Sequence, residues 1–522
     1  MKFKNALISV SDKTGLVDFL KPLAQSGLRI VSTGGTYKHL KEAGFEVVDI
    51  SEQTGFPEVL DGRVKTLHPH VHMAVLARMD EPEHRQVLEQ YKLMPFDLVI
   101  CNLYPFEQTL AAKKPLEDLI ENIDIGGPTL LRASAKNYHS VTVICDPKDY
   151  DWILAKALGE EGMGDEDRLH LAAKVFSHCS GYDSVIAETL EAPTGLKTLA
   201  GRLVQTLRYG ENPQQKASWY ALRGQYPGLH EAKILQGKEL SYNNLLDLDA
   251  AVGLVREFSE PAAVAVKHNN PCGVGVDASS LRAMEKALKA DTVSVFGGIV
   301  ASNFRIESSQ AELLSEIFLE CIVAPDFSIE ARNIFSKKKN LRILEWDALA
   351  LGSERLGVRK SEISKKPIPP TEFRSLLGGF LVQEKDDYLN ETSSWKILGN
   401  TITEQVKKDL LFGEKVCGSL KSNSIAIVYE GQTLGLGMGQ VNRVDAVEQA
   451  LRRWKTHHPH VISPCLVSDA FFPFRDSIDL IAQSGLKTIL HPGGSLRDEE
   501  VIQAAQEKGI LMILTGKRHF RH

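Results

Sequence analysis

A lysine and a histidine stand side by side after an apolar run in the middle of the chain. Residues 263–266, Ala-Val-Ala-Val, are typical of a short buried strand, and Lys267, His268, two asparagines and Pro-Cys-Gly follow. Pro271 and Gly273 predict a turn, so we expect the polar side chains where the strand leaves its sheet. An imidazole can accept a proton near neutral pH, and an ammonium can stabilise developing negative charge. The pair is a candidate for proton transfer, although without its context a surface turn is the commoner explanation.

Two segments near the N-terminus are rich in hydroxyl groups and glycine and follow apolar runs. They are residues 9–15, Ser-Val-Ser-Asp-Lys-Thr-Gly, and residues 32–36, Ser-Thr-Gly-Gly-Thr. Hydroxyls and free backbone N–H groups at the start of a helix suit a phosphate, and Lys13 adds a positive charge. Serine and threonine in such places are also ordinary helix caps. The chain has no G-x-x-x-x-G-K-[ST] run, and residues 435–439 lack the glycine spacing of a dinucleotide-binding loop.

Further charged groups could form an anion-binding pocket together with these two segments. Residues 62–69, Gly-Arg-Val-Lys-Thr-Leu-His-Pro, place an arginine and a lysine at alternate positions, which point to one side of an extended segment. They predict an anion pocket, and the alternative is a solvated basic turn. Tyr104, Asp124 and Lys136 add a phenol, a carboxylate and an amine, all of which can transfer protons, although any one of them is usually structural.

The first 150 residues predict a parallel α/β sheet that would position these groups. Strand-like runs occur at residues 6–10, 29–31, 97–101 and 141–145. Helix-like segments follow the first two runs, from about Thr14 and Thr36, and this alternation is typical of crossover connections. Residues 191–195, Glu-Ala-Pro-Thr-Gly, end a helix predicted over 169–190 and indicate a domain boundary.

A second boundary is predicted at residues 364–370, Ser-Lys-Lys-Pro-Ile-Pro-Pro. The segments on its two sides look like copies of one α/β unit. Four blocks that begin at Lys267, Ala283, Val293 and Ile322 recur in the same order at Lys421, Ala446, Val467 and Ile489. The alternative is chance recurrence of common strand-turn-helix patterns. The predicted domains are residues 1–198, 199–366 and 367–522.

The composition limits the classes of protein to consider. At 522 residues the chain is too long for one hydrophobic core, and its net charge of −6 gives no electrostatic reason to expect nucleic acid or membrane binding. The seven cysteines are scattered and never form a C-x-x-C pair, which fits a reducing cytoplasm. The N-terminal apolar run is only as long as a strand, so we expect neither a signal peptide nor a membrane span.

The chain resembles the family of bifunctional purine-biosynthesis proteins that join an AICAR transformylase to an IMP cyclohydrolase. The matching motifs are SVSDKTGL, GRVKTLHP, DIGG, LRYGENP, VKHNNPCG, SDAFFPFRD and the closing RHFRH. The resemblance implies an N-terminal methylglyoxal-synthase-like α/β domain with a parallel sheet, followed by a transformylase domain of two cytidine-deaminase-like α/β units. It also implies formyl transfer from 10-formyltetrahydrofolate to AICAR, then dehydrative ring closure of formyl-AICAR to IMP.

For formyl transfer, the resemblance implies that His268 is the general base for the 5-amino group of AICAR. Lys267 would stabilise charge on the formyl oxygen or the departing folate nitrogen, and Asn423 would be the third catalytic residue. The implied AICAR contacts are Arg208, Tyr209, Phe296, Gly297, Glu320, Arg443 and Arg518, where some relatives have aspartate at the position of Glu320. The implied folate contacts are Phe471, Asp476 and Ser495.

For ring closure, the carboxamide nitrogen adds to the formyl carbon and water leaves, which requires linked acids and bases. Lys136 resembles the proton acceptor, with Asp124, Tyr104 and Lys65 around it. A lysine is a poor base at neutral pH unless its pKa falls, and the sequence leaves open which lysine is the base. The implied IMP and formyl-AICAR contacts are Ser11, Asp12, Lys13, Thr33, Gly34, Gly35, Thr36, Arg63, Val64, Thr66, Cys101, Asn102 and Ile125.

Deaminase-like folds often bind zinc, but Cys272 in Pro-Cys-Gly-Val-Gly offers one thiol where P-C-x-x-C offers two. We therefore predict no catalytic metal, with 10-formyltetrahydrofolate as a co-substrate. A non-catalytic nucleotide sensor would be expected to lack the implied catalytic residues, and a nucleoside deaminase would be expected to have zinc ligands. The resemblance also implies small-molecule substrates and a cytoplasmic homodimer.

Overall fold

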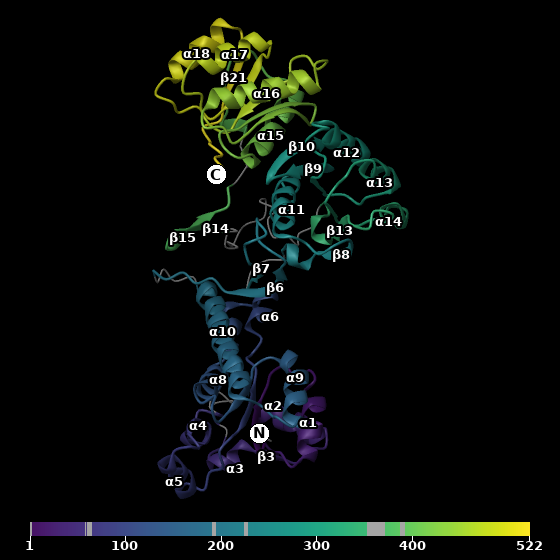
Figure 1. Cartoon of the computed structure of the whole chain (residues 1–522). Helices are drawn as coiled ribbons and strands as arrows, with labels where there is room; N and C mark the ends of the chain where they lie inside the picture. The colour runs from purple at the N-terminus through teal and green to yellow at the C-terminus, as the bar shows by residue number, and fades with distance from the viewer. Residues whose placement is uncertain are drawn as a thin grey trace. The chain divides into compact units, whose positions relative to one another are not determined.

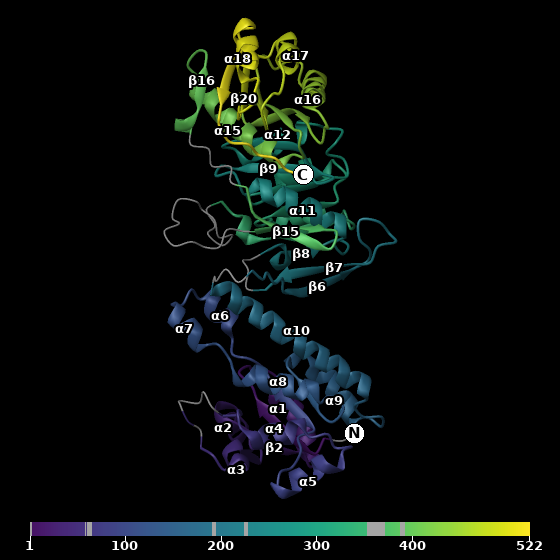
Figure 2. The same ribbon diagram turned by 90° about the vertical axis from the view of Figure 1, so that its left-hand side faces the viewer.

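The computed structural model describes residues 3–57, 59, 65–190, 195–223, 228–351, 371–386 and 392–522. The predicted contact residues Arg63 and Val64 lie outside these ranges, as do the residues at the predicted boundary 366–367. The chain forms two compact units, one of residues 1–202 with 222–225, and one of residues 203–221 with 226–522 (Figures 1 and 2). Among the described residues, no helix is both long and apolar enough to cross a membrane.

The first unit is built on a five-stranded parallel sheet in the order β3-β2-β1-β4-β5, which confirms the predicted parallel sheet. Its strands are β1 (Asn5–Ser9), β2 (Arg29–Ser32), β3 (Val47–Asp49), β4 (Leu98–Cys101) and β5 (Thr142–Ile144). Consecutive residues of β1 from Ala6 to Ile8 are fully buried, so both faces of the sheet are covered.

Helices surround this sheet. They are α1 (Leu16–Gln25), α2 (Gly34–Glu42), α3 (Ile50–Thr54), α4 (Pro69–Leu76), α5 (Pro82–Gln90), α6 (Phe106–Ala111), α7 (Leu116–Glu121), α8 (Gly126–Lys136), α9 (Tyr150–Leu158) and α10 (Asp165–Thr189). All of them except α5 contribute residues to one hydrophobic core with the sheet. Helices α1 and α2 begin close to the predicted starts at Thr14 and Thr36. The small differences arise because the spacing of apolar residues predicts that a helix forms better than it predicts its end residues.

The second unit contains a twelve-stranded sheet in the order β16-β21-β20-β19-β17-β18-β10-β9-β11-β12-β13-β8. The strands of its first half are β8 (Lys233–Gln236), β9 (Ala262–Lys267), β10 (Asn270–Val276), β11 (Ile299–Ser302), β12 (Cys321–Ala324) and β13 (Arg342–Glu345). Those of its second half are β16 (Lys396–Leu398), β17 (Ile425–Tyr429), β18 (Gln432–Gly437), β19 (Cys465–Ser468), β20 (Thr488–His491) and β21 (Leu511–Leu514). The halves meet where β10 pairs antiparallel with β18.

The strand order confirms the predicted duplication, because β8 to β13 and β16 to β21 follow the same path outward from the β10–β18 pair. Close contacts repeat as well. A Cβ on Gly273 would lie 2.1 Å from a backbone oxygen of the helix that follows β10, and one on Gly435 would lie 2.2 Å from a backbone oxygen of the helix that follows β18. The two glycines occupy equivalent positions in the two halves and let each helix approach its hairpin closely.

Helices cover both faces of the twelve-stranded sheet. They are α11 (Tyr242–Val255), α12 (Ser280–Lys289), α13 (Ser308–Ser315), α14 (Ile329–Phe335), α15 (Glu404–Ser419), α16 (Arg443–His457), α17 (Asp476–Ser484) and α18 (Asp498–Glu507). One core contains residues of α11 and α15 from the two halves. On the other face, α12 to α14 cover the first half and α16 to α18 the second.

Two small sheets complete the fold. One pairs β6 (Gly201–Leu207) with β7 (Ala217–Leu222), and the other pairs β14 (Thr371–Leu376) with β15 (Gly379–Glu384). The residues of β15 are all exposed within the single chain.

Candidate active sites

In the first unit, the predicted residues gather at one edge of the parallel sheet. The segments after β1, β2 and β4 leave their strands at the carboxyl ends, where parallel α/β sheets bind ligands. Asn102 ties two of these segments together, since its Oδ1 accepts hydrogen bonds from the backbone nitrogens of Ser11 (2.6 Å) and Asp12 (2.9 Å). Its Nδ2 donates to the Asp12 carbonyl oxygen at 2.8 Å. Asn102 therefore fixes the loop that carries Lys13.

The hydroxyl groups after β2 hold neighbouring loops in place. The Thr36 hydroxyl accepts from the Val10 nitrogen (3.0 Å) and donates to the Val10 carbonyl oxygen (2.9 Å), and the hydroxyls of Ser9 and Thr33 lie 3.1 Å apart. Thr33 and Thr36 are both buried. Gly34 begins α2, where backbone N–H groups have no partner within the helix and can face an anion.

Asp124 is held at the start of α8 by backbone groups. Its Oδ1 accepts from the Gly127 nitrogen (2.7 Å) and its Oδ2 from the Tyr104 nitrogen (3.3 Å). Burial raises the pKa of its carboxyl group, against the lowering effect of these two hydrogen bonds. The Tyr182 hydroxyl accepts from the Asp124 nitrogen at 2.8 Å and donates to the Asn122 carbonyl oxygen at 3.1 Å. The sequence gives no local signal for Tyr182, which lies 58 residues away on α10.

The two candidate lysines lie in different places. Lys65 is partly exposed and precedes Thr66, whose hydroxyl lies 3.2 Å from where a Cβ on Gly126 would be, at the start of α8. Lys136 is exposed and ends the same helix, about 15 Å along its axis by the usual rise per residue. Thr66, next to Lys65, therefore lies at the end of α8 that adjoins Asp124, whereas Lys136 lies at its other end.

Cys101 and Ile125 complete the predicted set of the first unit. Cys101 ends β4, and its buried thiol lies 3.9 Å from the Gly127 carbonyl oxygen. Burial keeps the pKa of this thiol well above its usual range, so it packs as a neutral group. Ile125 is 60% exposed beside Asp124, as expected of an apolar group that could contact a ligand.

In the second unit, strand direction brings most predicted residues to one edge of the twelve-stranded sheet. Phe296, Gly297 and Glu320 precede β11 and β12, which run antiparallel to β9, so they lie at the end of β9 that carries Lys267. Because β10 and β18 are antiparallel, this edge continues to the start of β17 and the carboxyl ends of β19 to β21. Asn423, Phe471, Ser495 and Arg518 adjoin these ends.

His268 lies in a two-residue hairpin loop. Lys267 pairs with Asn270, and the two residues between them have φ angles of 53° and 62°, the combination of a type I′ turn. The prediction that Pro271 and Gly273 form the turn is wrong, because both lie within β10, with a register shift between them. His268 is exposed, and the Lys267 Nζ donates to the Phe296 carbonyl oxygen at 2.7 Å.

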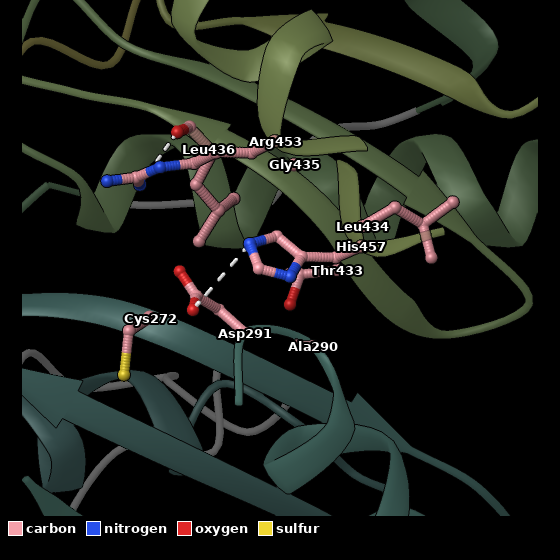
Figure 3. A pocket seen from close by; sticks show the side chains of 9 residues that line it. All are labelled: Cys272, Ala290, Asp291, Thr433, Leu434, Gly435, Leu436, Arg453 and His457. Atoms are coloured by element: carbon pink, nitrogen blue, oxygen red, sulfur yellow. Dashed lines mark hydrogen bonds and ion pairs between the residues drawn. The ribbon is translucent and has the colours of Figure 1, made fainter. Parts of the chain in front are cut away.

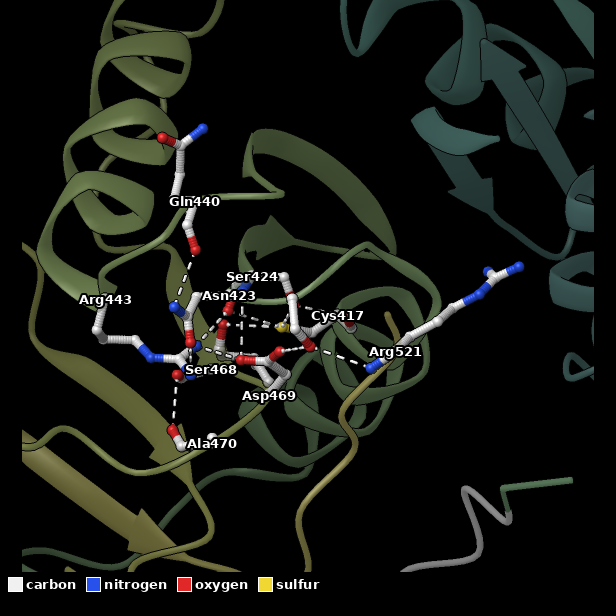
Figure 4. Close-up of polar contacts among 11 residues, drawn as sticks. Cys417, Asn423, Ser424, Gln440, Arg443, Ser468, Asp469, Ala470 and Arg521 are labelled. Carbon is white, nitrogen blue, oxygen red and sulfur yellow. Dashed lines mark hydrogen bonds and ion pairs between the residues drawn. The ribbon is translucent and has the colours of Figure 1, made fainter. Parts of the chain in front are cut away.

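Asn270 connects this loop to the segment that contains Asn423. Its Nδ2 donates to the His268 carbonyl oxygen, and its Oδ1 accepts from the Lys421 nitrogen, both at 3.0 Å. Asn423 is itself fixed, since its Nδ2 donates to the Gln440 carbonyl oxygen at 2.9 Å (Figure 4). The three predicted catalytic residues thus belong to two segments joined through one amide.

Arg443 is buried beneath Asn423 in the network of Figure 4. Its Nη2 donates to the Asn423 Oδ1 (2.8 Å), and its Nη1 donates to the Ser424 carbonyl oxygen (3.1 Å) and to the buried carboxylate of Asp469. In this arrangement Arg443 orients Asn423, and its predicted contact with AICAR stays a prediction.

The other predicted AICAR and folate contacts make local interactions. The Arg208 guanidinium lies 4.8 Å from the ring centre of Tyr209, and that of Arg518 lies 4.6 Å from the ring centre of Phe520. Glu320 forms an ion pair with the buried Arg342 at 2.6 Å. Asp476 begins α17 and accepts from the Ser477 nitrogen at 2.6 Å, and the Ser495 nitrogen donates to Asp498 at 3.0 Å.

The family to which the chain belongs follows from its matches to known proteins. Residues 134–453 match the family model described as AICARFT/IMPCHase bienzyme, and residues 15–129 match the MGS-like domain. The chain belongs to the AICARFT/IMPCHase bienzyme family. The first match alone covers more than half of the chain, which confirms the resemblance stated from the sequence motifs.

Curated members of the family match over almost their whole length. The bifunctional purine biosynthesis protein PurH of Persephonella marina is 46% identical over 532 residues, covering 99% of this chain and 100% of the relative. PurH of Rhodospirillum rubrum is 46% identical over 538 residues, covering 100% of this chain and 99% of the relative. The solved structure titled "Crystal structure of ForH" is 35% identical over 36% of this chain and 100% of its own, with a TM-score of 0.32.

A pocket lies where the two halves of the second unit meet, and it does not coincide with the predicted formyl-transfer site. Asp291, Arg453 and His457 line it together with Cys272 (Figure 3), and none of its lining residues is among those predicted. The Cys272 thiol donates to the Ala265 carbonyl oxygen at 3.5 Å, and burial raises its pKa to about 12. Within the described ranges, no group of three or more His, Cys, Asp or Glu side chains could hold a metal ion.

Proposed function

We propose that this bifunctional purine-biosynthesis enzyme divides its two reactions between its two units, with formyl transfer in the second and ring closure in the first. The observation that carries the proposal is the gathering of the motif residues of each reaction at one sheet edge of one unit. In support, the chain has both domains of the family, and PurH relatives match it along its whole length.

For formyl transfer, we assign His268 as the base that removes a proton from the 5-amino group of AICAR as its nitrogen attacks the formyl carbon. The new C–N bond forms, the bond from the formyl carbon to the folate nitrogen breaks, and the tetrahydrofolate nitrogen takes a proton. Lys267 would place its ammonium near the developing charge, and Asn423 would orient the substrate. The exposed loop position of His268 and the anchored positions of its two partners support these roles.

For ring closure, Asp124 is assigned to proton transfer, with Tyr104 beside it. The raised pKa of Asp124 supports this role, because a carboxyl group that ionises nearer to neutrality can both donate and accept a proton. Lys136 is the proposed acceptor by resemblance, and the position of Lys65 near the start of α8 makes it the alternative. Parallel kinetics of Lys65→Ala and Lys136→Ala decide between them, since loss of the base lowers kcat most.

The remaining assignments rest on the family. We propose 10-formyltetrahydrofolate as co-substrate, no catalytic metal, a cytoplasmic homodimer, and domains of residues 1–198, 199–366 and 367–522. The division of the chain into units near residue 202 supports the first boundary. If the boundary holds, a fragment of residues 1–198 that folds should still cyclise formyl-AICAR.

The direct test is to incubate the purified chain with AICAR and 10-formyltetrahydrofolate and to follow tetrahydrofolate and IMP. Both should form, and formyl-AICAR supplied alone should yield IMP without folate. Release of tetrahydrofolate without IMP would remove the ring-closure assignment. If no tetrahydrofolate forms from AICAR and 10-formyltetrahydrofolate while supplied formyl-AICAR still closes to IMP, the transferase assignment falls. Elemental analysis that finds stoichiometric zinc, lost together with activity on chelation, would overturn the metal-free proposal.

A further inference from the structure

The hairpin loop that carries His268 is capped by a carboxylate from another element. Asp247 lies on α11, and its Oδ1 accepts a hydrogen bond from the Asn269 nitrogen at 2.6 Å. Burial raises the pKa of this carboxylate, while the backbone N–H groups of Asn269 and His268 interact with it and act to lower the pKa. Through the N–H of Asn269, Asp247 therefore anchors a loop that lies 22 residues further along the chain.

The Asp247 carboxylate binds a loop whose backbone has an unfavourable conformation. His268 and Asn269 have φ angles of 53° and 62°, a left-handed region that residues with a side chain adopt at a cost. The charge-assisted hydrogen bond from Asn269 to this carboxylate offsets part of that cost and fixes the direction in which the loop presents the His268 side chain. An imidazole on an uncapped loop would sample more positions.

The second half of the unit contains the same device. Asp409 lies on α15, and its Oδ1 accepts a hydrogen bond from the Gly431 nitrogen at 3.1 Å. The φ angles of this loop are 45° and 69°. In both copies the carboxylate precedes the second loop nitrogen by 22 residues, so the caps are equivalent parts of the duplication.

The two copies differ in what their loops carry. The Glu430–Gly431 loop joins the end of β17 to β18 and lies at the sheet edge opposite to Asn423, which precedes the start of β17. It also has glycine where the first loop has Asn269, and glycine adopts a positive φ without strain. The second copy is a built-in control that keeps the cap without the candidate active site.

We propose that Asp247 is a positioning residue for formyl transfer, which holds the His268–Asn269 loop in the conformation that presents His268 to AICAR. The inference rests on the proposed function of His268 and deepens it. Asp247 needs no contact with either substrate for this role, because it acts through the backbone.

The experiment compares Asp247→Ala with Asp409→Ala in the full-length chain. Thermal midpoint, kcat and KM for AICAR in formyl transfer, and the rate of ring closure of supplied formyl-AICAR are measured on each preparation. Asp247→Ala should lower the transferase kcat by about tenfold or more, since small misplacements of a catalytic group are costly, with a much smaller change in KM. Asp409→Ala should lower the thermal midpoint but leave kcat within about twofold, and both variants should retain ring closure.

The Asn269→Gly substitution distinguishes a positioning role of Asp247 from general destabilisation of the protein. It makes the first loop resemble the second and removes the cost of the positive φ at that position, so the loss of kcat caused by Asp247→Ala should shrink several-fold in the Asn269→Gly background. No rescue, an unchanged kcat for Asp247→Ala, or an equal loss of kcat in Asp409→Ala would each overturn the inference. If Asp247→Ala does not fold, Asp247→Asn is measured in its place, with a smaller loss and the same rescue expected.

The wild-type chain and His268→Ala separate this inference from the proposed function. If the wild type releases no tetrahydrofolate, the proposed function fails. If the wild type is active and His268→Ala is impaired while folded Asp247→Ala is not, the inference about Asp247 fails alone.

Discussion

The side chain of Asn270 accepts a hydrogen bond from the backbone nitrogen of Lys421 at 3.0 Å, across 151 residues of sequence. The same amide donates to the carbonyl oxygen of His268. One side chain thus joins the loop with the proposed base to the segment with Asn423, one from each half of the duplicated unit. This link joins segments from both halves of the duplicated fold at one edge of its sheet.

Removing this link should affect formyl transfer more than stability. Asn270→Ala leaves the Lys421 N–H without this acceptor, at a cost of about 1–3 kcal/mol in the free energy of unfolding. Misalignment of the two segments should also lower the transferase kcat, by about tenfold, without a change in ring closure. Urea unfolding and steady-state kinetics of both reactions on one preparation check this, and an unchanged kcat would show that the segments stay aligned without Asn270.

A second prediction concerns Tyr182, which fixes the backbone around Asp124. Tyr182→Phe keeps the ring but removes the hydroxyl that binds the Asp124 nitrogen and the Asn122 carbonyl oxygen. We expect the rate of ring closure to fall by about tenfold, because the carboxyl group is no longer held in place, while formyl transfer is unaffected. Tyr150→Phe is a matched control on the same unit, and an equal loss of rate in both variants would argue against a specific role for Tyr182.

The C-terminal His519 predicts a pH dependence of stability. Burial alone would lower the pKa of this imidazole, but the hydrogen bond with Asp386 at 2.8 Å and the nearby carboxylate of Glu414 at 3.6 Å outweigh burial and raise the pKa to about 9. A raised folded-state pKa means that the stabilisation is complete below the usual pKa of 6.5 and is lost as the pH rises to about 9. The full effect is on the order of 3 kcal/mol.

The measurement is chemical denaturation of the wild type and His519→Gln between about pH 6 and pH 9.5. The difference in unfolding free energy between the two proteins should shrink steadily as the pH rises. A difference that stays constant across this range would show that His519 is not held in its charged form.

Much of the fold could be predicted because it is encoded in local patterns. The apolar runs that became β1, β2, β4 and β5 are short and separated by amphipathic helices, which specifies a parallel sheet. The duplication was visible for the same reason. The predicted matches of Ala283 with Ala446 and of Ile322 with Ile489 agree with the structure, in which α12 corresponds to α16 and β12 to β20.

The other two predicted matches are wrong, for a physical reason. The loop after β9 corresponds to the loop after β17, so His268 matches Glu430, and Lys267 matches Tyr429 rather than Lys421. Likewise, Val293 precedes β11, whereas its predicted match Val467 lies within β19. Strand register depends on backbone pairing between distant segments, which similarity of a few side chains does not reveal.

In the candidate sites, too, interactions between distant segments could not be predicted from local sequence patterns. Motifs identified the residues that we assign to the substrates, including Lys267, His268 and Asp124. They did not identify Asp247 or Tyr182, because each acts on a partner in another element through the backbone. Nor did the sequence reveal that Arg443 is buried against Asp469, since an arginine in a polar segment is usually exposed.

If His268 is the base of formyl transfer, in a unit separate from ring closure, His268→Ala should impair the first reaction and spare the second. The variant should fold with a thermal midpoint near that of the wild type, because the side chain is exposed. Its transferase kcat should fall by about 10² to 10⁴-fold, AICAR binding should weaken far less, and supplied formyl-AICAR should still close to IMP at the wild-type rate. A wild-type rate of formyl transfer in well-folded His268→Ala would show that His268 is not the base.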